Sequence, residues 1–94
     1  MKVYEMMNLD GVNACMVAAK NLKEAAELMD ITPYQMRRMG WRYASDATTD
    51  QSTLDAASTA LAKPGVRLYR PVTPRAEPWR EERYLREELY RRPR

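Results

Sequence analysis

Histidine is absent from this 94-residue chain, and cysteine occurs once, as Cys15. The lack of histidine excludes imidazole acid–base catalysis, a Ser-His-Asp triad and an imidazole metal site. A single cysteine excludes an intramolecular disulfide and a metal site built from several cysteines. Cys15 lies in the apolar run "VNACMVAAK", where we expect a small buried side chain, with a reactive thiol as the alternative.

Glycine is scarce as well, and long apolar runs are missing. The three glycines, Gly11, Gly40 and Gly65, are too far apart to form a phosphate-binding loop. No run approaches the roughly 18 apolar residues that a membrane span needs. The N-terminus reaches charged and turn residues too early for a signal peptide. We therefore expect a cytoplasmic protein that is not an enzyme, with no cofactor, no bound metal and no membrane partner.

The chain contains seven methionines and has a mild excess of positive charge. Methionine adapts to irregular cores and to variable interfaces. The net charge is +3, and its distribution is more informative than its size. Thr32–Tyr43 holds Arg37, Arg38 and Arg42 and no acid. We expect this local charge of +3 to lie on one helix.

The order of apolar, polar and turn residues predicts a small α+β domain over residues 1–72. Asp10-Gly11 favours a hairpin turn between the first two strands. The second strand is apolar on both faces, which predicts a central or covered position. The third helix has its predicted apolar stripe at Leu54, Ala57 and Leu61. The expected elements are strands Lys2–Met7 and Val12–Ala19, helices at about Leu22–Met29, Pro33–Gly40 and Asp50–Ala62, and a short strand within Val66–Val72.

The first two of these helices have clear N-terminal capping signals. Thr32 and Gln35 have the spacing of a capping box, and Pro33 occupies the first helical position, where no N–H is needed. Asn21 is a favourable N-cap for the helix before it, and Glu24 has the spacing to bond back to the N–H of that cap. Both helices are therefore expected to begin at defined residues.

The same segment has the pattern of a helix-turn-helix. A small residue, Ala26, lies where the second helix must cross the first, and Asp30 lies where the turn needs left-handed geometry. Apolar residues fill the expected core positions: Ala25, Met29, Ile31, Met36 and Met39.

Over Asn21–Met39, the stretch "KEAAELMDITPYQMRR" resembles the helix-turn-helix superfamily, with Asp30 where that family usually has glycine. More widely, Val12–Val72 is similar to small uncharacterised proteins of bacteriophages and mobile elements. That similarity implies an accessory protein.

If the segment binds DNA, its polar residues would contact bases and phosphates. Arg37 and Arg38 would contact phosphate or guanine, and Gln35 would contact adenine. Thr32 and the start of the second helix would hold a phosphate. The alternative is that these are ordinary solvated groups on a helical hairpin. The full predicted DNA-binding set is Thr32, Tyr34, Gln35, Arg37, Arg38, Arg42, Lys20 and Lys23.

Two aromatic groups have alternative interpretations. Trp41 and Tyr43 follow the second helix, where they could stack on bases or anchor a protein; we prefer Trp41 as a residue that closes the core. A Pro-rich linker, residues 73–78, precedes a charged helical tail, residues 79–94. The tail either binds a partner or packs on the domain. Its predicted partner-binding residues are Trp79, Arg83, Tyr84, Arg86 and Tyr90.

Two functions follow from these patterns. The first is a DNA-binding protein of a mobile element, which contacts DNA through Thr32–Arg38 and forms a homodimer through its tail. The second is a phage-type, anti-CRISPR-like inhibitor of a host defence or nucleic-acid machine, which would act by contact with a host protein complex.

Overall fold

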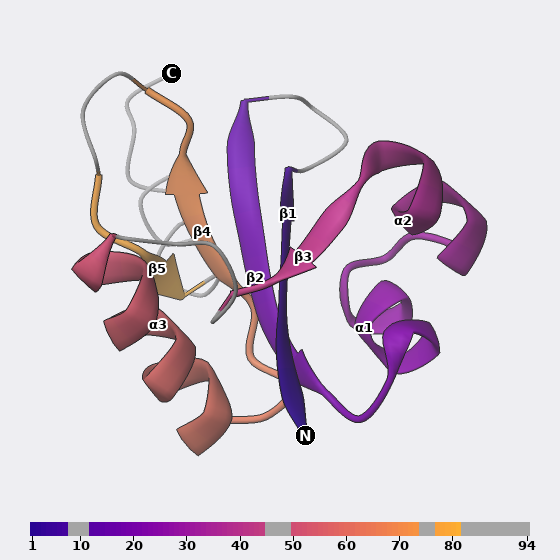
Figure 1. The fold of residues 1–94 in the computed structure, drawn as a ribbon, viewed down its shortest axis with the longest axis horizontal. Helices are drawn as coiled ribbons and strands as arrows, with labels where there is room; N and C mark the ends of the chain where they lie inside the picture. Colours follow the sequence, from indigo (N-terminus) through magenta and orange to yellow (C-terminus); the bar gives the residue numbers. More distant parts are fainter. Residues whose placement is uncertain (8–11, 45–49, 74–76, 82–94) are drawn as a thin grey trace, which may run out of the picture.

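The computed structural model describes residues 1–7, 12–44, 50–73 and 77–81. These residues form a five-stranded antiparallel sheet and three helices (Figure 1), which confirms the α+β prediction. The strand order in the sheet is β3-β1-β2-β4-β5. The elements are β1 (Lys2–Met7), β2 (Asn13–Ala19), α1 (Leu22–Leu28), α2 (Pro33–Met39), β3 (Trp41–Tyr43), α3 (Gln51–Ala62), β4 (Leu68–Pro71) and β5 (Arg80–Glu81).

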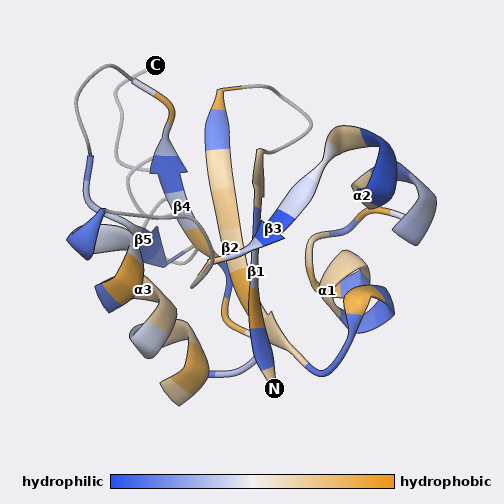
Figure 2. Cartoon of the chain, in the orientation of Figure 1, coloured by the Kyte–Doolittle hydropathy of each residue, from blue (hydrophilic) through white to orange (hydrophobic). Residues whose placement is uncertain are grey.

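The sheet separates two cores, with α1 and α2 on one face and α3 on the other (Figure 1). Successive side chains of β2 point to opposite faces of the sheet, so Cys15 and Val17 lie in the core beneath α1 and α2. Met16 and Ala18 enter the core beneath α3. The prediction that this strand is central is confirmed, and Figure 2 shows its largely apolar course through the sheet. Cys15 is 1% exposed, so its expected burial is also confirmed.

Helices α1 and α2 begin where the sequence predicts. The Thr32 hydroxyl accepts from the Gln35 backbone N–H at 3.1 Å, and Gln35 Oε1 accepts from the Thr32 N–H at 2.9 Å. Asn21 Oδ1 likewise accepts from the Glu24 N–H at 2.9 Å. The expected return bond of Glu24 is displaced by one residue, because its carboxylate accepts from the N–H of Lys20 at 3.3 Å.

The turn between α1 and α2 has the expected left-handed residue. Asp30 has φ 58°, and its carboxylate pairs with Arg67 at 3.4 Å, from the segment that leads into β4. The small residue at the helix crossing, Ala26, is fully buried. The predicted core positions are buried or half-buried against the same core: Ala25, Met29, Ile31, Met36 and Met39.

The predicted apolar stripe of α3 is wrong for two of its three residues. Leu61 is 47% exposed and Leu54 is half-buried, while Ala57 is buried. The helix turns its small side chains toward the sheet, where Ala56, Ala57 and Ala60 belong to the same core as Met16 and Leu68. The buried face of α3 consists of Thr53, Ala56, Ala57 and Ala60.

The predicted helix from Trp79 is also wrong at its start, because Arg80–Glu81 is strand β5 and pairs with β4. The helical signal of this region comes from Glu–Arg pairs that begin at Glu82, so it does not constrain Trp79 or β5. Residues 77–81 therefore belong to the same domain as residues 1–72, and residues 82–94 lie outside the described part. None of the described helices has the length and apolar character needed to cross a membrane.

Candidate nucleic-acid interface

The outer face of α2 presents one aromatic and two cationic side chains. Tyr34 is 64% exposed, and Arg37 and Arg38 in the last turn are also exposed. Met36, on the opposite side of the helix, is fully buried and fixes α2 to the core. Helix α2 contains no acid. In Figure 2 the part of α2 next to β3 is strongly hydrophilic.

Tyr34 and Arg38 lie one turn apart and contact each other. Arg38 Nη1 donates to the Tyr34 hydroxyl at 3.2 Å, and the guanidinium lies 5.9 Å from the ring centroid. This contact holds Arg38 along the outer face of α2 while leaving most of its five donors unused. Arg37 makes no ion pair within the described ranges of the chain. Two guanidinium groups are thus available at one end of α2.

The capping box limits what the start of α2 can contact. Gln35 Oε1 and the Thr32 hydroxyl are both used to cap the helix. A bidentate contact with adenine needs both the oxygen and the amide nitrogen of a glutamine. Gln35 can therefore offer its N–H donors, but its oxygen would have to leave the cap first.

Lys20 and Lys23 are exposed but do not lie beside the two arginines. Lys20 precedes α1, and Lys23 is in its first turn, whereas Arg37 and Arg38 are in the last turn of α2. In Figure 1 the chain enters α1 at the bottom of the view and leaves α2 toward β3 at the top. The lysines and arginines therefore occupy opposite ends of the helix pair.

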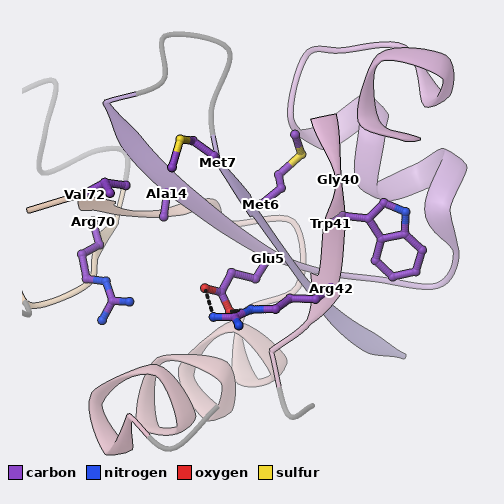
Figure 3. Close-up of a pocket in the computed structure, with 9 residues that line it drawn as sticks. All are labelled: Glu5, Met6, Met7, Ala14, Gly40, Trp41, Arg42, Arg70 and Val72. Carbon is purple, nitrogen blue, oxygen red and sulfur yellow. Dashed lines mark hydrogen bonds and ion pairs between the residues drawn. The ribbon is translucent and has the colours of Figure 1, made fainter. Parts of the chain in front are cut away.

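Arg42 does not belong to this surface. Gly40, with φ 81°, ends α2, and Arg42 lies in β3 opposite Glu5 of β1. Its Nε and Nη2 donate to the two carboxylate oxygens of Glu5 at 3.4 and 3.2 Å. In Figure 3 the side chain of Trp41 points away from this ion pair. The predicted local charge of +3 is thus divided: two charges lie on α2 and the third lies on the other face of the sheet.

The aromatic residues of β3 contribute to the core beneath α1 and α2. Tyr4, Trp41 and Tyr43 form a cluster with ring centroids 5.0–5.3 Å apart, and Lys2 Nζ lies 4.4 Å from the Tyr43 centroid. Burial, reinforced by the neighbouring Tyr43, raises the pKa of Tyr4. Trp41 is half-buried against this core, in agreement with the preferred interpretation that it closes the core.

Trp79 packs on the domain, which was the alternative to partner binding. Its Nε1 donates to Thr53 Oγ1 at 3.2 Å, and the Arg70 guanidinium lies 4.7 Å from its ring. Arg70 also pairs with Asp50, the N-cap of α3. Hydrogen bonds from Arg70, then from Thr53, lower the pKa of Asp50 to about 2. The other predicted partner-binding residues lie outside the described part: Arg83, Tyr84, Arg86 and Tyr90.

A hollow on the α3 face of the sheet was not predicted from the sequence. Its volume is about 440 Å³. It has no continuous sequence signal because it is formed by residues from four strands and the segments next to them. The lining residues are Glu5, Met6, Met7, Ala14, Gly40, Trp41, Arg42, Arg70 and Val72 (Figure 3).

Comparisons of the chain with protein-family models, with curated proteins and with solved structures gave no match. The functional inference below therefore depends on the geometry and chemistry of the described residues.

Proposed function

We propose that this protein binds DNA, with the outer face of α2 against the duplex. The observation that carries the proposal is a capped, acid-free helix whose exposed side includes Tyr34, Arg37 and Arg38. Arginine forms bidentate hydrogen bonds with guanine O6 and N7 and with phosphate oxygens. A helix that is anchored by Met36 and capped at Thr32 holds these groups in a fixed orientation.

The contacts fall into two groups at opposite ends of the helix pair. Arg37 and Arg38 would contact base edges or phosphates, while Lys20 and Lys23 would bind the DNA backbone from the start of α1. Such a division is compatible with a duplex that lies along both helices. The resemblance to helix-turn-helix proteins supports the same orientation.

The length of α2 limits the affinity of one copy. A seven-residue helix is about 10 Å long at 1.5 Å per residue, which spans on the order of three base pairs at 3.4 Å each. Specific binding would therefore require two copies on adjacent half-sites. A homodimer formed through the C-terminal tail would supply the second helix. Because residues 77–81 belong to the domain, the test of this dimer is a chain that ends at Glu81.

The second candidate function is inhibition of a host defence or nucleic-acid machine by protein contact. One observation favours it: exposed apolar side chains border the hollow on the face of the sheet opposite α2.

The test of DNA binding is a fluorescence-anisotropy titration of a labelled mixed-sequence duplex at several salt concentrations. Up to four cations contact phosphate in this proposal. The slope of log affinity against log salt should therefore lie between about −2 and about −4. An absence of binding at low salt would contradict the proposal. Sedimentation of the full chain and of the chain that ends at Glu81 then tests the tail dimer separately.

A further inference from the structure

Exposed apolar side chains gather at one end of the sheet. Met7, Val12 and Val72 are 42%, 59% and 49% exposed. The Val72 N–H donates to the Val12 carbonyl at 2.8 Å, and Met7 lies opposite Ala14 in the β1–β2 register. Met7 and Val12 flank the connection between β1 and β2, and the pairing of β2 with β4 brings the distant Val72 beside them. An apolar patch with a polar rim is typical of a surface that binds another protein.

The patch borders the hollow of Figure 3. Met7, Ala14 and Val72 provide its apolar lining, and Arg42 and Arg70 provide cationic groups. Helix α3 covers the sheet next to it, over other residues of the same face, which are Val3, Met16, Ala18 and Leu68. The hollow is therefore the part of this face that α3 leaves open. Its volume of about 440 Å³ is large enough for one or two side chains of a partner.

The exposed charge at the hollow is positive. The Glu5 side chain is 8% exposed, while that of its partner Arg42 is 50% exposed. The carboxylate therefore lies beneath the guanidinium and fixes it, and the cation faces solvent. Arg42 uses Nε and Nη2 for Glu5, which leaves its Nη1 donors for another acceptor. Arg70 differs: its side chain is 17% exposed, less than the 33% of its partner Asp50, and it lies over the Trp79 ring.

We propose that this hollow binds a segment of another protein that carries an apolar side chain next to a carboxylate. The apolar side chain would cover Met7, Ala14 and Val72, where methionine can adapt its shape to the partner. The carboxylate would accept hydrogen bonds from the free edge of Arg42, a charge-assisted contact with a group that is already ordered. This site lies on the opposite face of the sheet from α1 and α2. It is therefore independent of the proposed DNA contact.

The test uses three synthetic peptides and the full chain labelled with ¹³C at the methionine methyl groups. The first peptide alternates Asp and Leu, the second has Lys in place of Asp, and the third has Ser in place of Leu. We expect the first peptide to shift the Met7 methyl signal and leave that of the fully buried Met36 unchanged. The lysine and serine peptides should bind at least tenfold more weakly. Equal binding of all three peptides, or no binding of the first, would overturn the proposal.

Substitutions of residues that line the hollow test whether the first peptide binds there. Arg42→Gln should weaken the first peptide about tenfold, and the double variant Met7→Gln, Val72→Gln should weaken it at least fivefold. Leu61→Gln is the matched control, because Leu61 is 47% exposed elsewhere on the molecule, and it should have no effect. Unchanged affinity in both hollow variants would overturn the proposal. So would binding that is seen only when the chain ends at Glu81, since residues 82–94 would then be the occupant of the hollow.

Discussion

The Arg42 guanidinium donates hydrogen bonds to both carboxylate oxygens of Glu5, a residue 37 positions earlier in the chain. This ion pair joins the edge strand β3 to β1 and lies on the α3 face of the sheet. It removes Arg42 from the basic surface of α2, to which its position in the sequence had assigned it. It also fixes a cation at the edge of the hollow. The Glu5–Arg42 ion pair therefore separates the outer surface of α2 from the hollow on the α3 face, which could not be distinguished from the sequence.

Arg42→Ala should destabilise the fold. The substitution leaves the nearly buried Glu5 carboxylate without its partner, at an expected cost of about 1–2 kcal/mol. Urea unfolding monitored by circular dichroism measures this loss. Arg37→Ala is the control, since Arg37 is exposed and its loss should change the free energy of unfolding by less than about 0.5 kcal/mol. Equal effects of the two substitutions would show that the Glu5–Arg42 pair contributes nothing to stability.

Asp30→Gly should be more stable than Asp30→Ala. Both substitutions delete the carboxylate that pairs with Arg67, so their difference isolates the backbone conformation. At the observed φ of 58°, alanine is disfavoured by about 1–2 kcal/mol, while glycine is not. Thermal unfolding of the two variants gives the comparison. A stability of the alanine variant equal to that of the glycine variant would contradict the left-handed turn between α1 and α2.

Gln35→Glu should separate the structural role of α2 from its proposed binding role. Glutamate can replace glutamine in a capping box, so the free energy of unfolding should change by less than about 0.5 kcal/mol. The added negative charge faces the proposed DNA surface, and we expect duplex affinity to fall by about tenfold, which corresponds to 1.4 kcal/mol. Anisotropy titrations measure the affinity. Unchanged affinity would mean that the start of α2 does not approach DNA.

Asp50 should make the stability of the domain depend on pH in the acidic range. Its pKa in the folded protein is about 2, below the value of about 3.9 for an unfolded chain. The stabilisation by ionised Asp50 is therefore complete above about pH 5 and is lost as the pH falls toward 2. Asp50→Asn keeps an N-cap residue and removes the charge. The difference in the free energy of unfolding between wild type and Asp50→Asn should become smaller as the pH falls from 5 to 2. A difference that stays constant over this range would contradict the assigned role of ionised Asp50.

The helix pair was predictable because its signals are local. Capping at Thr32, the left-handed turn at Asp30 and the small residue Ala26 each depend on neighbours within a few positions. The expected bonds, φ angle and burial are all observed. Such features belong to individual helices and turns, so they do not require knowledge of the tertiary structure.

The remaining errors come from contacts between distant parts of the chain. Arg42 was assigned to the surface of α2, although the predicted helix ends at Gly40, because nothing in its own segment shows that β3 pairs with β1. The expected stripe of α3 favoured leucines, whereas close packing on the sheet selected alanines. Trp79 was assigned to a helix by the charge pairs that follow it, although its contacts are with Thr53 and Arg70. The hollow could not be predicted because it depends on the register of four strands.

The most direct test of the proposed DNA contact compares two double variants that remove the same charge. Arg37→Gln with Arg38→Gln, and Arg42→Gln with Lys63→Gln, each lower the net charge from +3 by two. The measurement is the slope of log duplex affinity against log salt concentration. We expect the first pair to reduce the magnitude of the slope by about 2, since each lost phosphate contact contributes about 0.9, and the second pair to leave it near the wild-type value. Equal slopes together with equal affinities for the two variants would show that binding depends only on the net charge, and α2 would then not be the contact surface.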